Sequence, residues 1–293
     1  MKYAYFPGCS LKGTGRAYEE SFLAVCGALT MDVQEIPDWN CCGATAYMSV
    51  DETQALALAA RNLALAEKLE AGAVVAPCSG CYLELMKSKK LIEEYDDTGR
   101  HIRRAIQAGG LTYFGKIAIR HPLDVFVNDV GLEAIRAKVR KPLKGLKVAA
   151  YYGCQIVRPY STFDDQRRPT SMEKLLESAG GAAVDFPLRT RCCGGSLTGT
   201  VTEVGLRLGY ILLREAKRRG ADVIAACCPL CQFNLDTYQQ EIKKQHDGDA
   251  QIPVVYFTQL LGLALGLPES QLGFSRNIST VKPLLAERQL AAT

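Results

Sequence analysis

The chain has 293 residues, 48% of them apolar and 23% charged, which is typical of a globular protein large enough to bury its own core. Its formal net charge of +4 is small and it has no arginine-rich segment with interleaved aromatic residues, so we expect no nucleic-acid partner. The first residues do not resemble a secretion signal, and the longest apolar run, residues 254–267, is shorter than a bilayer span. These features predict a cytoplasmic protein without a membrane span.

In chain order, short apolar runs bounded by Gly or Pro lead into four cysteines, and this pattern predicts a buried strand before each of Cys9, Cys78, Cys154 and Cys228. Helices are predicted over residues 52–70 and 204–219. Gly72 and Gly220 follow these helices and are predicted to be their C-cap glycines. Several helices are expected between residues 86 and 139, and the apolar run at 254–267 is interpreted as a core helix.

Ten of the twelve cysteines form two sets of five that repeat in order and spacing. The first set is Cys9, Cys41, Cys42, Cys78 and Cys81, and the second set is Cys154, Cys192, Cys193, Cys228 and Cys231. Corresponding cysteines are 145 to 151 residues apart, and neighbouring residues repeat as well. Matched motifs in the same order indicate an internal duplication.

The duplication predicts an α/β fold with two homologous cysteine-rich domains, residues 1–143 and 144–293. Each domain is expected to have a small, mostly parallel sheet flanked by helices. Functional groups in such sheets gather at the carboxyl ends of the strands, so the five cysteines of each set are expected to converge there.

Five thiols in each set are compatible with three kinds of chemistry. Structural zinc takes four thiolates, commonly as two Cys-x-x-Cys pairs, and each set has one such pair and one cysteine too many. A thioredoxin-like dithiol needs only the Cys-x-x-Cys pair and leaves three cysteines unexplained. Thiolates also favour iron–sulfur clusters, although an ordinary cubane uses four of them. The residues favour iron–sulfur binding and leave the cluster type open.

A pair of clusters would suit disulfide chemistry. A disulfide is a two-electron couple, whereas an iron–sulfur cluster ordinarily passes one electron at a time. Two equivalent clusters facing each other across a cleft would match that stoichiometry, so we expect the two sets to lie close together.

Residues beside the two sets carry weaker signals. We expect four glycines to let the backbone approach a bound cofactor: Gly8, Gly43, Gly153 and Gly194. Cys26 and Cys227 are predicted to be buried residues rather than ligands, and His121 is the histidine to test as a proton donor. Five basic residues are candidates to bind an anionic substrate or to offset cofactor charge: Lys12, Arg16, Arg158, Arg189 and Arg191.

These motifs resemble the B subunit of heterodisulfide reductase over nearly the whole chain. The matching segments are Phe6-Pro7-Gly8-Cys9, Asn40-Cys41-Cys42-Gly43, Cys78-Ser79-Gly80-Cys81, Tyr152-Gly153-Cys154, Arg191-Cys192-Cys193-Gly194-Gly195 and residues 228–235. The resemblance implies two non-cubane [4Fe–4S] clusters, each held by the five cysteines of one set, and so makes all ten cysteines metal ligands and catalytic residues. It also implies a substrate disulfide, such as that joining coenzyme M and coenzyme B, which is split at the clusters into two thiols.

The resemblance further implies a complex with a flavin-containing, iron–sulfur A subunit and an iron–sulfur C subunit. The chain has neither a cubane-binding cysteine run nor a glycine-rich dinucleotide fingerprint, so a partner would exchange the electrons. Fused relatives, such as thiol–fumarate reductases, are disfavoured because no ferredoxin-like segment precedes the repeat. Two alternatives stay open: a sulfur-oxidising complex acting on a protein-bound thiol or persulfide, and a non-catalytic electron-transfer subunit.

Overall fold

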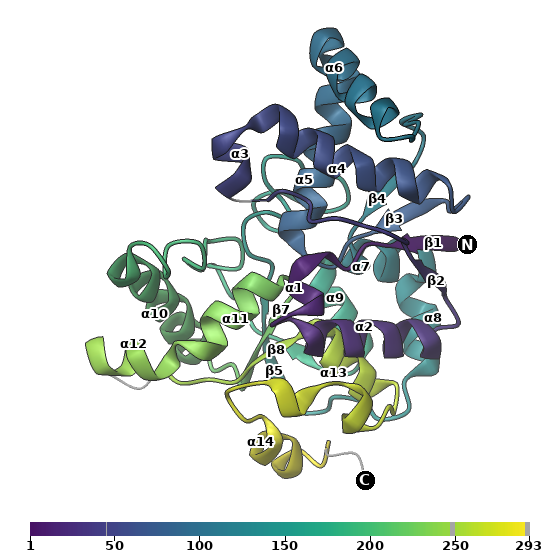
Figure 1. The fold of residues 1–293 in the computed structure, drawn as a ribbon. Helices are drawn as coiled ribbons and strands as arrows, with labels where there is room; N and C mark the ends of the chain where they lie inside the picture. Colours follow the sequence, from purple (N-terminus) through teal and green to yellow (C-terminus); the bar gives the residue numbers. More distant parts are fainter. Residues whose placement is uncertain (45, 247–249, 291–293) are drawn as a thin grey trace.

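The computed structural model of the protein describes residues 1–44, 46–246 and 250–290 and contains two α/β units (Figure 1). Each unit has a four-stranded sheet in which all neighbouring strands are parallel. The strand orders are β2-β1-β3-β4 and β6-β5-β7-β8, so the strands of the two halves correspond one to one. The predicted fold class, with its internal repeat, is therefore confirmed.

The strands are short and mainly buried. The first sheet consists of β1 (Lys2–Tyr5), β2 (Asp32–Glu35), β3 (Ala73–Val75) and β4 (Ala118–Arg120). The second consists of β5 (Lys147–Tyr151), β6 (Ala182–Ala183), β7 (Val223–Ala226) and β8 (Val254–Tyr256). The apolar runs predicted before four of the cysteines are β1, β3, β5 and β7.

Helices connect and cover the strands in both halves. The first half has α1 (Gly8–Lys12), α2 (Arg16–Ala28), α3 (Ala46–Val50), α4 (Glu52–Glu67), α5 (Ser79–Glu94), α6 (Asp96–Ala108), α7 (Pro122–Asp124), the π-helix η1 (Val125–Gly131) and α8 (Leu132–Lys138). The second half has α9 (Ser171–Ser178), α10 (Thr202–Arg218), α11 (Pro229–Thr237), α12 (Gln239–Gln245), α13 (Phe257–Ala264), the 3₁₀ turns η2 (Glu269–Gln271) and η3 (Phe274–Arg276), and α14 (Lys282–Glu287).

The structure corrects two local predictions. Residues 254–267 do not form one helix, because 254–256 pair with β7 as strand β8 before α13 begins. The left-handed residue after α4 is Glu70, with φ 52°, rather than Gly72. The N–H groups of Leu69 and Glu70 bond to carbonyls three residues back, so the chain turns before it reaches the glycine. Gly220, with φ +74°, follows α10 as predicted.

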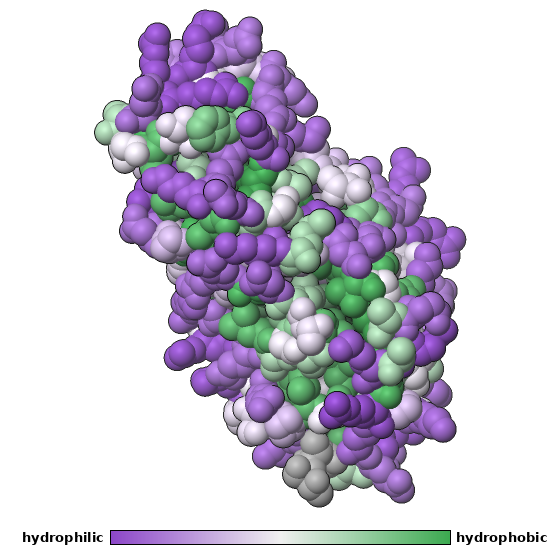
Figure 2. Space-filling view, turned by 90° about the vertical axis from the view of Figure 1, so that its right-hand side faces the viewer, coloured by the Kyte–Doolittle hydropathy of each residue, from purple (hydrophilic) through white to green (hydrophobic). Residues whose placement is uncertain are grey.

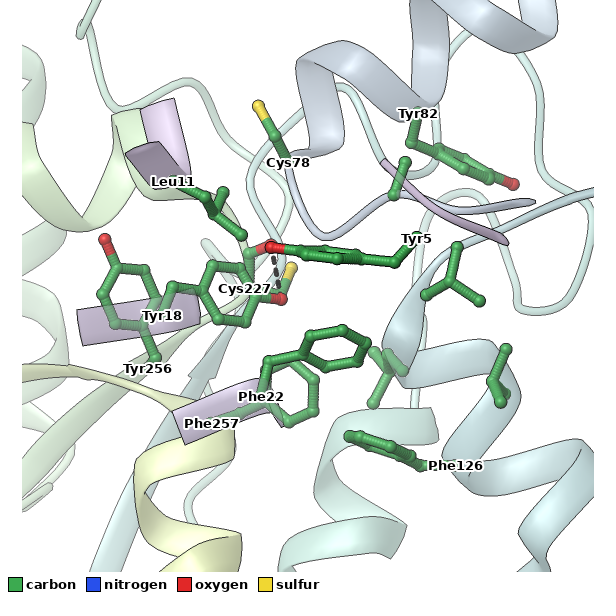
Figure 3. Close-up of a cluster of buried hydrophobic side chains, with 14 of the residues drawn as sticks. Tyr5, Leu11, Tyr18, Phe22, Cys78, Tyr82, Phe126, Cys227, Tyr256 and Phe257 are labelled. Atoms are coloured by element: carbon green, nitrogen blue, oxygen red, sulfur yellow. Dashed lines mark hydrogen bonds between the residues drawn. The ribbon is translucent and has the colours of Figure 1, made fainter. Parts of the chain in front are cut away.

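The two halves share one large core. Helix α2 of the first half packs along α13 of the second, and α9 of the second half packs against η1 and α8 of the first (Figure 1). The larger hydrophobic cluster runs from Tyr3 to Leu290, and a smaller one lies within the second half. Figure 3 shows part of the shared core, where aromatic rings of both halves surround Cys227. The domain limits 1–143 and 144–293 remain our prediction.

The surface differs between the two ends of the molecule. The end that carries α6 is mainly hydrophilic on the face drawn in Figure 2, whereas hydrophobic residues gather on the lower part of that face. None of the helices in the described part of the chain is both long enough and apolar enough to cross a membrane.

Candidate functional site

The sheets bring the cysteines of each set to the carboxyl ends of their strands. Cys9 lies on α1 directly after β1, and Cys78 and Cys81 lie at the start of α5 directly after β3. The second half repeats this arrangement with Cys228 and Cys231 at the start of α11 after β7. The double cysteines lie in the loops that follow the edge strands β2 and β6.

The sulfurs of the first set form a series of contacts. The Sγ atoms of Cys42 and Cys81 are 3.2 Å apart. The thiol of Cys41 lies within hydrogen-bonding reach of Cys42, and that of Cys78 within reach of Cys81. Cys9 is the fifth member and interacts electrostatically with Cys41.

The second set repeats the series and joins the first. Cys154 lies within hydrogen-bonding reach of Cys192, the adjacent Cys193 within reach of Cys231, and Cys231 within reach of Cys228. The thiol of Cys78 also lies within hydrogen-bonding reach of Cys228. The two sets therefore meet at this pair, one cysteine from each half, and form one array of sulfurs.

Interactions among the thiols lower the pKa of some cysteines and raise that of others. Hydrogen bonding with Cys41 and Cys81 lowers the pKa of Cys42 to about 4, and hydrogen bonding with Cys154 and Cys193 lowers the pKa of Cys192 to about 2. Hydrogen bonds from Cys231 and Cys78 likewise hold the pKa of Cys228 well below its usual range. The pKa values of the donor thiols are raised, so these groups would have to lose protons before they could bind a metal.

Each set has a buried part and an accessible part. Cys42, Cys78 and Cys81 are buried, as are their counterparts Cys193, Cys228 and Cys231. Cys9, Cys41 and Cys192 are exposed and Cys154 is half-buried. The inner sulfurs are thus shielded from water, whereas the outer two sulfurs of each set can meet a molecule from solution.

Two of the predicted glycines lie directly against a sulfur. A Cβ atom on Gly8 would be 2.7 Å from Sγ of Cys81, and one on Gly153 would be 2.9 Å from Sγ of Cys231. Both glycines have positive φ, which favours glycine over other residues.

The other two glycines lie against helices. Gly43 and Gly194 also have positive φ, but their missing side chains leave room for helices rather than for a sulfur. A Cβ on Gly43 would contact Ala55 of α4, and one on Gly194 would lie 2.8 Å from the carbonyl oxygen of Gly205 on α10.

Buried asparagines hold the double-cysteine loops. The side chain of Asn62 on α4 accepts from the backbone N–H of Asn40 and donates to the carbonyl of Asn40, both at 2.9 Å. On α11, Asn234 donates to the carbonyl of Cys193 at 2.9 Å. Neither role was predicted. A polar residue on a helical face carries no sign of a distant backbone partner.

A second buried group holds the two central cysteine loops together. The Nε2 atom of His121 lies 3.0 Å from the carbonyl oxygen of Pro77 and 3.1 Å from that of Cys227, the residues just before Cys78 and Cys228. Its Nδ1 accepts the N–H of Leu123, so the proton is on Nε2. Burial lowers the pKa of His121 to about 4, and the ring is neutral at pH 7. This buried position argues for a positioning role rather than for proton donation.

The two cysteines outside the sets are buried. Cys26 lies on α2, where burial raises the pKa of its thiol. Cys227 is fully buried, and its Sγ donates to the carbonyl of Tyr152 at 3.3 Å.

Three of the five basic candidates already have partners. Lys12 pairs with Glu19 and Glu35, and the buried Arg189 pairs with Glu173 at 2.5 Å and with Asp185. Arg158 donates to the carbonyl of Thr190. Arg16 and Arg191 are exposed, and their side chains make no hydrogen bond or ion pair within the described residues. These two arginines are the ones left for an anionic ligand.

The donor set fits an iron–sulfur cluster in each half. Each set offers only sulfur ligands, which iron–sulfur clusters prefer. In each set a glycine, Gly8 or Gly153, leaves space beside an inner sulfur, that of Cys81 or Cys231. The sulfurs follow one another in a series rather than surrounding one point. Among residues 1–44, 46–246 and 250–290, the structure has no group of three or more His, Cys, Asp or Glu side chains arranged to hold a single metal ion.

Comparison with known proteins identifies the repeated unit. The cysteine-rich domain family CCG matches residues 3–86 and 148–236. The 8-methylmenaquinol:fumarate reductase membrane anchor subunit of Wolinella succinogenes is 33% identical over 94% of this chain and 96% of its own length. The B subunit of the ferredoxin:CoB-CoM heterodisulfide reductase of Methanosarcina mazei is 29% identical over 94% of this chain and 93% of its own.

One solved structure shares the fold. A hypothetical protein from Helicobacter pylori superposes with a TM-score of 0.75 and 16% identity, over 96% of this chain and 52% of that chain. This chain thus spans about half of that protein, and the likeness concerns the fold alone. Together with the two cysteine-rich domains, the relatives show that the chain belongs to the family of oxidoreductase subunits that includes the B subunit of heterodisulfide reductase.

Proposed function

We propose that the protein is the disulfide-reducing or thiol-oxidising subunit of a larger redox complex, with one non-cubane [4Fe–4S] cluster held by each set of five cysteines. The observation that carries the proposal is the bridge that His121 forms between the carbonyls of Pro77 and Cys227, because these residues come just before Cys78 and Cys228 and the bridge holds the two sets side by side. Two cofactors held this close can exchange electrons, so two one-electron carriers can serve one disulfide bond.

The reaction would take up two electrons and two protons for each disulfide, break one sulfur–sulfur bond and release two thiols. The clusters would supply the electrons and the iron atoms to which substrate sulfur binds. A partner with flavin or further iron–sulfur cofactors would deliver the electrons, as the resemblance to heterodisulfide reductase implies for its A and C subunits. A cytoplasmic location would keep the free thiols reduced.

The chain's own residues would admit and orient the substrate. The accessible cysteines at the outer end of each set are where a substrate sulfur would arrive. Arg16 and Arg191, next to these ends in sequence, would bind the anionic groups of the substrate, since guanidinium pairs well with phosphate, carboxylate and sulfonate.

The test is the metal and acid-labile sulfide content of protein purified without oxygen, with electron paramagnetic resonance before and after a thiol is added. We expect about four irons and four sulfides for each set and a signal that changes with thiol. Cys42→Ala should lose the iron of the first set, whereas Cys26→Ala, a buried cysteine outside the sets, should keep both. About one zinc for each set and no sulfide would overturn the proposal.

A second candidate function is favoured by the Wolinella relative, whose name assigns it to a fumarate reductase. In that role the chain would relay electrons from a quinol toward fumarate within a larger complex, and its clusters would bind no disulfide. The two functions separate in one assay with an artificial electron donor. Turnover of a small disulfide by the loaded chain favours the reductase, whereas clusters whose spectra respond to no thiol or disulfide favour the relay.

A further inference from the structure

Tyr256 carries a buried hydroxyl without a partner. The residue ends β8 and precedes α13, and its side chain is 1% exposed. Its hydroxyl donates no hydrogen bond to any atom in the described part of the chain. An unpaired buried polar group loses the hydrogen bonds that it would make with water, so native proteins rarely leave one without a reason.

Tyr256 lies on the strand next to the one that leads into the Cys-x-x-Cys pair of the second set. Tyr256 pairs across the sheet with Ala226, two residues before Cys228. Burial raises the pKa of Tyr256, and the negative charges of Cys228, Asp236, Cys78 and Cys231 raise it further, so the hydroxyl keeps its proton.

The ring beside it has a different partner. Tyr18 stacks on Tyr256 with ring centroids 4.5 Å apart and planes within 13°, and its hydroxyl donates to the carbonyl of Cys227 at 3.3 Å. In Figure 3 the two hydroxyls of this stacked pair point in different directions, and only that of Tyr18 meets Cys227. The stacked ring holds the Tyr256 hydroxyl in a fixed position, and this hydroxyl does not bond to the carbonyl of Cys227 that Tyr18 uses.

The corresponding position in the first half differs. His121 and Tyr256 each begin the helix that follows the last strand of their sheet. The Nε2–H donor of His121 is already used on the carbonyls of Pro77 and Cys227. The two halves are therefore not equivalent, because only the second has a buried donor left over at this position.

We propose that the Tyr256 hydroxyl donates a hydrogen bond to a sulfur of the cluster held by the second set, and so makes that cluster the more readily reduced of the two. A hydrogen bond to sulfur stabilises the extra negative charge of the reduced state and raises the reduction potential. This inference rests on the proposed function. Instead of two equivalent clusters, it gives two clusters with different reduction potentials, of which that of the second set is reduced first.

The test is a redox titration of the loaded protein, followed by electron paramagnetic resonance, for wild type and Tyr256→Phe. We expect two reduction steps in wild type. In the variant the step at the higher potential should move to a more negative potential while the other stays in place. Tyr113→Phe is the matched control, because its hydroxyl is also buried and unpaired within the described residues but lies near Glu67 and Glu93 instead of the cysteines.

A second measurement needs no variant. Brief transfer of wild type into D₂O, which exchanges hydroxyl protons ahead of buried amides, should shift the iron–sulfur stretching bands in the resonance Raman spectrum. Fully loaded Tyr256→Phe protein with both potentials unchanged, or Raman bands that do not respond to D₂O, would overturn the inference while the proposed function stands. Wild-type protein without iron and sulfide would overturn the proposed function itself, and the inference with it.

Discussion

At the scale of single residues, the site depends on positions where no side chain fits. Gly8 combines a positive φ with a missing Cβ that would lie 2.7 Å from Sγ of Cys81. Gly110 of the same half has a similar φ of +75° but open space around it. Comparing substitutions at Gly8 and Gly110 therefore separates the effect of backbone strain from the effect of a collision with a sulfur.

We predict that Gly110→Ala loses about 1 kcal/mol of unfolding free energy through backbone strain alone and keeps its cofactor. Gly8→Ala should lose about 1–3 kcal/mol more, because Cys81 must move, and should lose the iron of the first set. Urea unfolding and iron analysis of both variants measure this. Equal losses in the two would show that the sulfur has room to spare.

His121 makes the stability of the protein depend on pH. Burial lowers its pKa to about 4, against about 6.5 in an unfolded chain. The unfolded state therefore binds more protons between these values, so the contribution of the neutral ring is complete above about pH 6.5 and is lost as the pH falls toward 4.

The matched variant is His121→Gln, which keeps a side-chain N–H donor and cannot be protonated. Between pH 7 and pH 5, we predict that wild type loses about 2 kcal/mol more unfolding free energy than the variant. Urea titrations at both pH values give the comparison. Parallel losses would mean that the ring is protonated in the folded protein as well.

At the scale of elements, helices α2 and α13, which come from different halves, share a buried polar contact. The hydroxyls of Ser21 and Thr258 share a hydrogen bond of 2.6 Å, and both side chains are fully buried. If either hydroxyl is removed, the other one loses this hydrogen bond and cannot replace it with a bond to water, because it is buried.

A double-mutant cycle of Ser21→Ala and Thr258→Val should therefore be non-additive, with a coupling of about 1 kcal/mol in the unfolding free energy. Ser178→Ala serves as the control, because its hydroxyl bonds to the carbonyl of Leu175 within α9. That variant should add to Thr258→Val without coupling. Additive effects in the first cycle would show that the contact does not help to join the helices.

At the scale of the whole molecule, the shared core predicts that the two homologous halves unfold together. Helices from each half pack on the other, and one hydrophobic cluster spans both. Breaking up either half would expose the apolar face of the other, which is the physical basis of a single cooperative transition.

The single tryptophan makes this testable, because Trp39 reports on the first half only, whereas far-UV circular dichroism reports on both. We predict coincident urea transitions for tryptophan fluorescence and circular dichroism. Two steps in the dichroism, with fluorescence following only one, would instead show that the halves are independent domains.

The sequence alone determined the repeat, the fold class and the membership of the two cysteine sets. These features are local, since strand and helix patterns and cysteine spacing are expressed within a few dozen residues. For the same reason the strands before the cysteines and helices α4 and α10 were predicted close to their observed limits. Strand β8 was missed because an apolar run suits a core helix as well as a buried strand, and only pairing with β7 decides between them.

The tertiary structure decided how the two sets meet and what surrounds them. The contact of Cys78 with Cys228, the bonds of His121 to both central loops and the pairing of Arg189 with Glu173 join distant parts of the chain or depend on burial. Tyr256 has no motif at all, and it became notable only because its buried hydroxyl has no partner within the described residues. The choice of a side-chain partner depends on which surfaces pack together, and that is a property of the folded chain rather than of any local segment.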